Sequence, residues 1–327
     1  MYPTQRMRRL RRRRIQPILR EHALGKDDLV VPLFVDECAD TPVPIESMPG
    51  QFRYPVSSIA GVARRLRQKG LTALLLFGIP ATKDSRASGA YAENGVVQRA
   101  IREVRNAVPE MVICTDVCAC EYTDHGHCGI VGETSEGPDL LNDPSLSLMQ
   151  RIAVSHADAG ADIVAPSSML DGVVGAIRTG LDQEGHHSVL IMSYSTKFAS
   201  AFYGPFREAA GSGYSFGDRT TYQIQPGNAR EAFRESELDA EEGADILMVK
   251  PAGLYLDILA DIRSIGLPVA AYQVSGEYAC LKAAGARGWI DERKAVMESL
   301  VCIKRAGADL IISYFAEDAA GWLDEEQ

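Results

Sequence analysis

The chain has 327 residues, with 44 acidic and 34 basic side chains, a formal net charge of -10 and a hydrophobic content of 46%. These values are ordinary for a globular protein, and no apolar run reaches the roughly 18 residues that a bilayer-spanning helix needs. The composition therefore excludes an integral membrane protein and predicts a soluble one. Seven cysteines, three of them within eleven residues, favour a reducing compartment and a metal site over a disulfide framework, so we expect a cytoplasmic protein.

Residues 1–20 are predicted to form a basic N-terminal arm. Eight arginines precede the first acidic residue, Glu21: Arg6, Arg8, Arg9, Arg11, Arg12, Arg13, Arg14 and Arg20. Such a segment is compatible with binding to nucleic acid or a membrane surface, or with a transit peptide, but it has no apolar h-region for secretion. Because it lacks interleaved aromatics and the acidic body would repel phosphate, we expect it to pack on a neighbouring subunit, with no nucleic-acid or membrane partner.

Eight β-rich apolar segments follow along the chain, separated by stretches of helical periodicity. They cover residues 29–37, 71–79, 111–118, 161–168, 188–195, 245–252, 268–275 and 308–316. Their near-continuous hydrophobicity is typical of parallel strands covered on both faces. Eight strand–helix units predict an α/β fold, a single (β/α)8 TIM barrel over residues 21–327. A doubly wound open sheet is the alternative, but no GxGxxG or Walker A motif follows any strand.

Three of these strands are entered through the same tripeptide, Gly-Ala-Asp, at residues 160–162, 243–245 and 307–309. Each copy follows a helical pattern, so the glycine is predicted to end the helix. The recurrence indicates one repeated supersecondary unit. Two longer connections, residues 119–142 and 198–228, follow the third and fifth strands and are predicted to lie on the catalytic face of the barrel.

The segment DVCACEYTDHGHCG places Cys118, Cys120 and Cys128 in a CxCx7C pattern. Three thiolates bind zinc strongly and leave the fourth tetrahedral position open for water or substrate, as in a catalytic site. His125 or His127 is an alternative fourth ligand, which would close the site, and an unmetallated cluster is the remaining alternative. The other four cysteines lie in apolar patterns and are expected to act as small hydrophobes: Cys38, Cys114, Cys280 and Cys302.

Two lysines stand at strand ends: Lys250 in ILMVKPA and Lys197 just past VLIMSYS. In a barrel mouth of low dielectric constant an ammonium group loses hydration, its pKa falls, and the neutral amine can attack a carbonyl. A neighbouring cation lowers that pKa further. A rim lysine that reaches solvent is the alternative for either residue alone, but the pair beside a thiolate cluster favours Schiff-base chemistry.

Other polar residues are expected around this mouth. Asp116 would share a strand face with Cys118 and is a candidate for proton transfer, while Ser275 and Tyr314 offer hydroxyls for a carboxylate. Residues 202–223 contain glycines, aromatics, Arg207 and Arg219, a composition compatible with a lid that closes on an anion.

Five segments together carry a family resemblance over essentially the whole chain: DVCACEYTDHGHCG, MSYSTKFASAFYGPFREA, LMVKPAGLYLDI, AYQVSGEYA and KRAGADLIISYF. They resemble, in order and spacing, segments of the porphobilinogen synthases, also called 5-aminolevulinate dehydratases. The resemblance implies a lyase (hydro-lyase) of tetrapyrrole and heme biosynthesis, which condenses two 5-aminolevulinate molecules to porphobilinogen and two waters. It discriminates against a class I aldolase, which needs one Schiff-base lysine and no thiolate zinc site.

The resemblance also implies roles for individual residues. Lys250 would form the Schiff base with the first substrate and Lys197 would engage the second, with Asp116 beside them. Ser275 and Tyr314 match the hydroxyls that hold the first carboxylate. The second carboxylate would be held by three lid residues, Arg207, Arg219 and Gln223.

The same resemblance implies the metals and the assembly. Cys118, Cys120 and Cys128 match the cysteines of the zinc-dependent branch, and Glu235 matches a glutamate of an allosteric magnesium site between subunits. The arm would wrap a neighbouring barrel in a homo-octamer. Its arginine run is denser than the family pattern, and QPGNAREA near Glu235 also departs slightly from it.

Overall fold

Eight parallel strands close into a barrel in the computed structural model, which describes residues 3–135 and 137–325. Residues 1 and 2 of the predicted arm, and residues 136, 326 and 327 of the predicted barrel domain, lie outside the described residues. Each strand pairs with the next in chain order, and the last pairs with the first. The barrel strands are β1 (Leu29–Asp36), β4 (Ala73–Ile79), β5 (Val112–Val117), β8 (Ile163–Pro166), β9 (Leu190–Lys197), β10 (Ile246–Lys250), β11 (Val269–Gln273) and β12 (Leu310–Ser313). The predicted (β/α)8 barrel is confirmed, and the doubly wound alternative is wrong.

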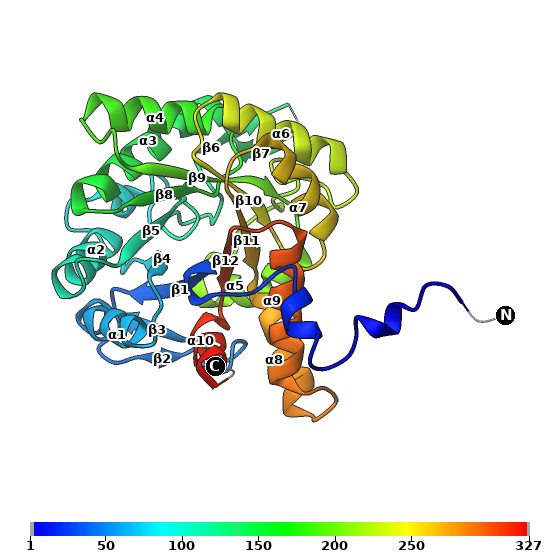
Figure 1. Ribbon diagram of the computed structural model, residues 1–327. Helices are drawn as coiled ribbons and strands as arrows, with labels where there is room; N and C mark the ends of the chain where they lie inside the picture. Colours follow the sequence, from blue (N-terminus) through cyan, green and yellow to red (C-terminus); the bar gives the residue numbers. More distant parts are fainter. Residues whose placement is uncertain (1–2, 136, 326–327) are drawn as a thin grey trace.

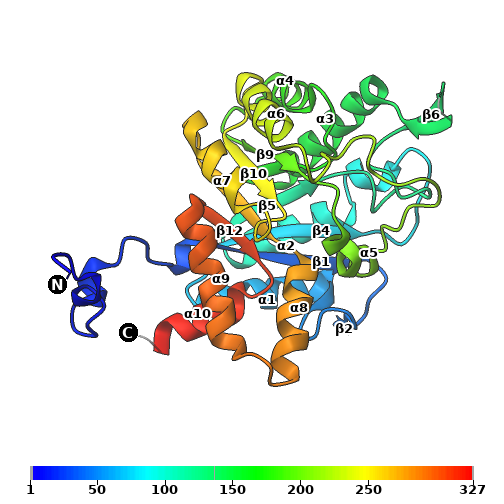
Figure 2. The same cartoon turned by 90° about the vertical axis from the view of Figure 1, so that its right-hand side faces the viewer.

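Helices surround this barrel on its outer side (Figures 1 and 2). They are α1 (Val56–Gln68), α2 (Val96–Ala107), α3 (Asn142–Ala159), α4 (Val173–Gln183), α6 (Ala229–Glu241), α7 (Leu256–Ile262), α8 (Ser275–Ala286), α9 (Glu292–Ala306) and α10 (Ala316–Glu325). Strands β1, β10 and β11 are buried almost throughout, because side chains fill the barrel on one face and helices cover the other. Across the described part of the chain, every helix is too short or too polar to cross a lipid bilayer.

The connections after the strands carry smaller elements. A hairpin of β2 (Val43–Pro44) and β3 (Phe52–Pro55) joins the edge of β1, and β6 (Val131–Thr134) pairs with β7 (Gly137–Leu140) after the third barrel strand. The connection after β9 contains η5 (Ala201–Tyr203) and α5 (Gly204–Ala210). Three short 3-10 turns complete the barrel domain: η3 (Lys26–Asp28), η4 (Ser88–Tyr91) and η6 (Arg263–Ile265).

The N-terminal arm extends away from the barrel (Figures 1 and 2). It contains η1 (Met7–Arg9) and η2 (Gln16–Leu19), neither of which has a buried residue. Its apolar side chains face solvent, and Ile18 is 77% exposed. The arm therefore has apolar surface that the barrel of its own chain does not cover.

The repeated Gly-Ala-Asp tripeptide is a connector that ends a helix and starts a strand. Gly160, Gly243 and Gly307 adopt positive φ angles of 107°, 104° and 128°, which only glycine adopts readily. The following alanine N–H donates back into the helix, to the carbonyl oxygens of residues 156, 239 and 303. This is the pattern of a Schellman cap, so the prediction that the glycine ends each helix is confirmed within a residue.

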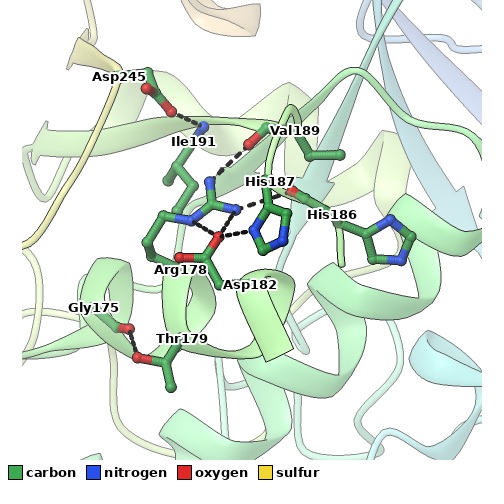
Figure 3. A network of polar contacts seen from close by, with 9 residues as sticks. All are labelled: Gly175, Arg178, Thr179, Asp182, His186, His187, Val189, Ile191 and Asp245. Carbon is green, nitrogen blue, oxygen red and sulfur yellow. Dashed lines mark hydrogen bonds and ion pairs between the residues drawn. The ribbon is translucent and has the colours of Figure 1, made fainter. Parts of the chain in front are cut away.

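The aspartate of each tripeptide then binds the preceding strand at two points. Its N–H donates to a strand carbonyl, and its carboxylate accepts the N–H of the same strand residue; Asp245 thereby pairs with Ile191 at 2.9 and 2.8 Å (Figure 3). Asp162 pairs with Ile113, and Asp309 with Val269, in the same way. These two hydrogen bonds pair neighbouring strands where the strands begin, at the end of the barrel away from the strand C-termini.

Figure 3 also shows how the turn before β9 is held. Arg178 of α4 donates to the carbonyl oxygens of Val189 and His186 at 2.8 and 3.0 Å, and it forms an ion pair with Asp182. One guanidinium thus satisfies two turn carbonyls that would otherwise lack donors.

Two of the four remaining cysteines differ from the prediction that they act as small buried hydrophobes. Cys114 is buried on β5 and Cys302 is half-buried, as expected. Cys38 and Cys280 are exposed, so the prediction is wrong for them. Cys38 follows the end of β1 and lies in a turn, and Cys280 lies on the outer face of α8, a helix whose apolar residues do not gather on one side.

Replacing the connector aspartate tests its contribution to stability. Asp245→Ala leaves the partly buried N–H of Ile191 without its carboxylate acceptor, so we expect the free energy of unfolding to fall by about 1–3 kcal/mol in urea titrations. Asp245→Asn keeps an acceptor oxygen and should retain most of this stability. Asp40→Ala, at an exposed aspartate, is the control and should change stability by less than about 0.5 kcal/mol. Equal losses in Asp245→Ala and Asp40→Ala would contradict the role.

Candidate functional site

The two predicted lysines stand side by side at the C-terminal ends of neighbouring strands. Lys197 is the last residue of β9 and Lys250 the last of β10, and they are register partners in the parallel ladder. Each side chain is only 5% exposed. The expected adjacency of the two lysines is therefore confirmed.

An irregularity in β9 determines which side chains point into this site. The pairing of β9 with β10 shifts register between Ser193 and Thr196, so β9 has one residue more than its partner there. Ser193 and Thr196 both hydrogen-bond to α6, outside the barrel. Tyr194 and Lys197 lie inside, although residues three apart in a regular strand face opposite sides. The bulge thus brings an aromatic ring and an amine to the same face.

The environment of Lys250 favours its neutral form. Burial and the nearby Lys197 ammonium together lower the pKa of Lys250 to about 7, while Asp116 opposes the shift. Its Nζ lies 4.3 to 5.3 Å from the centroids of four rings, those of Tyr272, Tyr194, Phe206 and Tyr203. Near neutral pH a large fraction of this amine is uncharged and nucleophilic.

Lys197 has a more polar environment. Its Nζ donates to the carbonyl oxygen of Ser167, at the end of β8, and lies 5.6 Å from the ring centroid of Tyr194. The two amines therefore share one aromatic neighbour but differ in their hydrogen bonding.

Asp116 of β5 lies beside both lysines. Burial and the nearby Glu121 together raise the pKa of Asp116 to about 7, although Lys197 and Lys250 oppose the shift. Ser167 Oγ donates to Oδ2 at 3.1 Å, while Oδ1 is buried without a hydrogen-bond partner. The Tyr194 hydroxyl is also buried without a partner. A carboxyl group with this pKa can both accept and donate a proton near pH 7.

The three cysteines of the CxCx7C pattern converge next to the lysines. Cys118, Cys120 and Cys128 are buried free thiols whose sulfur atoms lie within 4.8 Å of one another, with 3.4 Å between Cys118 and Cys120. Hydrogen bonds from the other two thiols hold the pKa of Cys128 well below its usual value. Three buried sulfurs at this spacing fit a tetrahedral zinc ion, whose ligand atoms lie about 3.8 Å apart.

The alternative fourth ligands, His125 and His127, are not directed at these sulfurs. Neither belongs to a group of convergent metal-ligating atoms among residues 3–135 and 137–325. Both ring nitrogens of His127 are in contact with other residues, at 3.1 Å from the Tyr222 hydroxyl and 3.1 Å from the Phe216 carbonyl oxygen. The geometry therefore does not support a closed four-ligand site.

A second group of metal-ligating atoms lies beside the first. Oxygen atoms of Asp116 and Glu121 and the sulfur of Cys118 are mutually within 4.8 Å. Glu121 is buried, and this burial raises the pKa of its carboxyl group. This second group shares Cys118 with the cysteine cluster and contains Asp116, which lies beside the lysines, so the two sites are adjacent.

The residues predicted to bind carboxylates surround this centre. Ser275 begins α8, where its hydroxyl accepts from Phe206 N–H at 3.0 Å and donates to Phe202 O at 3.2 Å. The Tyr314 hydroxyl lies 3.1 Å from that of Tyr272, which contacts Lys250. The Tyr314 hydroxyl is thus separated from Lys250 by the Tyr272 ring, and Ser275 lies in the first turn of a helix, a position that favours an anion.

The predicted lid residues cover the other side. Arg219 donates to the carbonyl oxygens of Gly126 and Ser212, at 2.9 and 2.8 Å. The Nε atoms of Arg207 and Arg219, and Nε2 of Gln223, are buried without a hydrogen-bond partner. Three donors near one mouth without acceptors suit an anionic ligand.

Glu235 lies apart from the lysines, on α6 facing a cavity of about 320 Å³. Three other acidic residues also line this cavity: Asp139, Asp171 and Glu231. Burial raises the pKa of Glu235, and the carboxylates of Asp171 and Glu231 add to the shift. The cavity reaches the lid through Tyr222 and Gln223, which also line it.

Sequence reasoning missed several residues of this site. They are Ser167, Tyr194, Tyr203, Phe206, Tyr272 and Glu121. Tyr194 and Tyr272 lie in strand patterns, and the bulge that turns Tyr194 inward has no signal in the sequence. Glu121 was recognisable only as an acid inside the cysteine motif, a position where a polar side chain is either a ligand or close to one.

Comparison with known proteins places this arrangement in a family. The model of the delta-aminolevulinic acid dehydratase family matches residues 4–322. The delta-aminolevulinic acid dehydratase of Halalkalibacterium halodurans is 51% identical over 324 residues, and the match covers 98% of each chain. The delta-aminolevulinic acid dehydratase of Archaeoglobus fulgidus is 52% identical over 320 residues, and this match also covers 98% of each chain. The crystal structure of the Toxoplasma gondii enzyme with its product porphobilinogen superposes with a TM-score of 0.96 at 43% identity, covering 99% of this chain and 93% of that chain.

Removing one lysine tests the electrostatic coupling of the pair. Lys197→Met removes a nearby positive charge, so the pKa of Lys250 should rise from about 7 and its amine should become reactive only at higher pH. The check is the pH dependence of borohydride trapping of a small keto acid on Lys250, followed by peptide mass spectrometry. Lys304→Met, at a lysine bound to Asp28 on the far side of the barrel, should leave the profile unchanged. An unchanged midpoint in Lys197→Met would show that burial alone lowers the pKa.

Proposed function

Because the chain belongs to the delta-aminolevulinic acid dehydratase family, which makes porphobilinogen for tetrapyrrole and heme biosynthesis, we propose that Lys250 and Lys197 catalyse this reaction as a pair of Schiff-base lysines. The observation that carries the proposal is their pairing at the ends of β9 and β10, where Lys250 has a pKa of about 7. The reaction joins two 5-aminolevulinate molecules and releases two waters, so the chain is a lyase.

The chemistry explains why two lysines are useful. The pyrrole ring needs one new C–C bond and one new C–N bond between the substrates, and both C4 carbonyl oxygens leave as water. A neutral lysine amine that attacks a carbonyl expels one water and leaves an imine, which is more electrophilic than the ketone once protonated. Lys250 takes the first substrate and Lys197 the second, and each amine is regenerated when the new ring bond or double bond displaces it.

Asp116 supplies and removes protons in this proposal. Each imine formation, carbon deprotonation and ring closure moves a proton, and a carboxyl group with a pKa of about 7 exchanges protons readily at neutral pH. Tyr194, between the two amines and with a hydroxyl lacking a partner, orients the substrates against the lysines.

The two substrate carboxylates bind at opposite sides of the lysines. Ser275 and Tyr314 hold the first, at the N-terminus of α8 next to Lys250. Arg207, Arg219 and Gln223 hold the second, and their buried donors without acceptors support this assignment. Binding of the anion would satisfy these donors and stabilise the closed lid.

Cys118, Cys120 and Cys128 are proposed to hold a catalytic zinc ion. The family is metal-dependent, and three convergent buried thiols, with neither His125 nor His127 in the convergent group, support an open zinc site rather than a structural one or an unmetallated cluster. Zinc bound there supplies a Lewis acid for the second substrate. The three cysteines would hold the metal, and their burial would shield it from solvent.

Two further proposals concern assembly and regulation. The acidic cavity around Glu235 suits a magnesium ion, because carboxylate oxygens are its preferred protein ligands, and we assign it an allosteric role on family grounds. The exposed apolar residues of the arm, residues 1–20, suit packing on the barrel, residues 21–327, of another copy in a homo-octamer. A cytoplasmic location stays a prediction from the cysteine content.

The first experiment measures porphobilinogen formation from 5-aminolevulinate. Lys250→Ala removes the nucleophile, so we expect turnover to fall by more than about 1,000-fold. Borohydride with substrate should trap one adduct on Lys250 in the parent enzyme and none there in the variant. Lys304→Met is the matched control and should keep parental turnover. Substantial turnover by a folded Lys250→Ala enzyme would remove Lys250 from the mechanism.

The second experiment tests the metal. Enzyme stripped by a chelator should regain activity with zinc and not with magnesium alone, and zinc content should be one ion per cysteine cluster by elemental analysis. Cys120→Ala removes one of three thiolates and should lower both zinc content and activity by at least about tenfold. Cys280→Ala, at an exposed cysteine of α8, should change neither. Restoration by magnesium alone would contradict the zinc assignment.

A further inference from the structure

The lid lies directly on the loop that carries the cysteines. We call residues 118–130 the metal loop, and residues 211–223 are the part of the predicted lid, residues 202–223, that follows α5. The N–H of Ser215 donates to the His125 carbonyl at 3.0 Å, and Arg219 donates to the carbonyl of Gly126 at 2.9 Å. The backbones approach so closely that a Cβ added at Gly126, which has a φ of +74°, would lie 2.2 Å from the Gly213 carbonyl oxygen. Only glycine permits this contact.

His127 lies at the centre of the contact and is 1% exposed. Its Nε2 lies 3.1 Å from the Phe216 carbonyl oxygen, an atom that only accepts, so this nitrogen carries the proton. Nδ1 lies within hydrogen-bond distance of the Tyr222 hydroxyl, at 3.1 Å. The imidazole ring also packs on Phe216, with 4.3 Å between centroids. One side chain of the metal loop thus binds two separate points of the lid.

The same contact reaches the cysteines and the substrate donors. Tyr222 packs against the cluster of Cys118, Cys120 and Cys128, and Cys128 directly follows His127. Gln223, the next residue after Tyr222, is one of the donors proposed for the second carboxylate. A change in the path of the metal loop would therefore move the lid, and opening of the lid would uncover the cysteines.

We propose that His127 is a positioning residue that latches the lid to the metal loop, so that metal binding at the cysteines and closure of the lid over the second substrate stabilise each other. The effect is reciprocal by thermodynamic linkage, because a ligand that favours the closed pair of segments is itself bound more tightly by it. The metal half of this inference rests on the zinc proposed above. The latch itself rests only on contacts between the two segments.

The test compares His127→Ala, His127→Gln and Tyr222→Phe with the parent enzyme. Three quantities are measured: hydrogen exchange of lid amides 211–223 in metal-free and zinc-loaded enzyme, the zinc dissociation constant by chelator competition, and KM and kcat for 5-aminolevulinate. The matched control is His187→Gln, at a histidine 72% exposed beside Asp182 (Figure 3).

We expect zinc to slow lid exchange in the parent enzyme. In His127→Ala, lid exchange, the zinc dissociation constant and KM should each rise about tenfold, as loss of two hydrogen bonds implies, with a smaller fall in kcat. His127→Gln and Tyr222→Phe should give intermediate values, and His187→Gln parental ones. Tyr222→Phe decides the question if the His127 variants do not fold.

Parental lid exchange in folded His127→Ala or Tyr222→Phe would overturn the latch. Faster lid exchange with an unchanged zinc dissociation constant would overturn the coupling. A parent enzyme that binds no zinc would refute the proposed metal, and the lid exchange of the metal-free variants would still decide the latch.

Discussion

The site depends on the electrostatic repulsion between two amines held next to each other in a poorly solvated barrel mouth. Register pairing of β9 and β10 places Lys197 beside Lys250, and the closed ladder prevents either strand from sliding to separate them. The cost of burying two ammonium groups is reduced if one of them is neutral. The environment assigns this form to Lys250, surrounded by rings, while Lys197 keeps a carbonyl acceptor.

The negative groups of the site follow from the same constraint. Asp116, Glu121 and the cysteine cluster lie on β5 and its following loop. Burial raises the pKa of Asp116, the nearby Glu121 adds to the shift, and the amines oppose it. Asp116 and Lys250 consequently both have a pKa of about 7, because burial favours the neutral form of each and the opposite charge of the other limits the shift.

The two ends of the barrel have different roles: the strand starts contribute to stability, and the strand ends carry the residues for the chemistry. At the strand starts, the three Gly-Ala-Asp connectors satisfy backbone groups at fixed points. At the strand ends, Asp116 Oδ1, the Tyr194 hydroxyl and the Arg207 and Arg219 Nε atoms are buried without partners. Unsatisfied polar groups are tolerated where substrate will satisfy them, and the lid limits their contact with water.

The sequence by itself determined the strand–helix repeat, the helix-ending glycines, the cysteine cluster and the two lysines, because each depends on local periodicity or on residue types that are rare at such positions. The residue roles that the family resemblance implies also came from the sequence, because the order of the motifs can be read from the sequence alone. Tertiary structure decided that β9 bulges and turns Tyr194 inward, that Glu121 joins Asp116, and that His127 faces the lid instead of the cysteines. These depend on the path of the backbone and on contacts between segments up to about ninety residues apart, such as His127 and Tyr222, which no local pattern of residue types records.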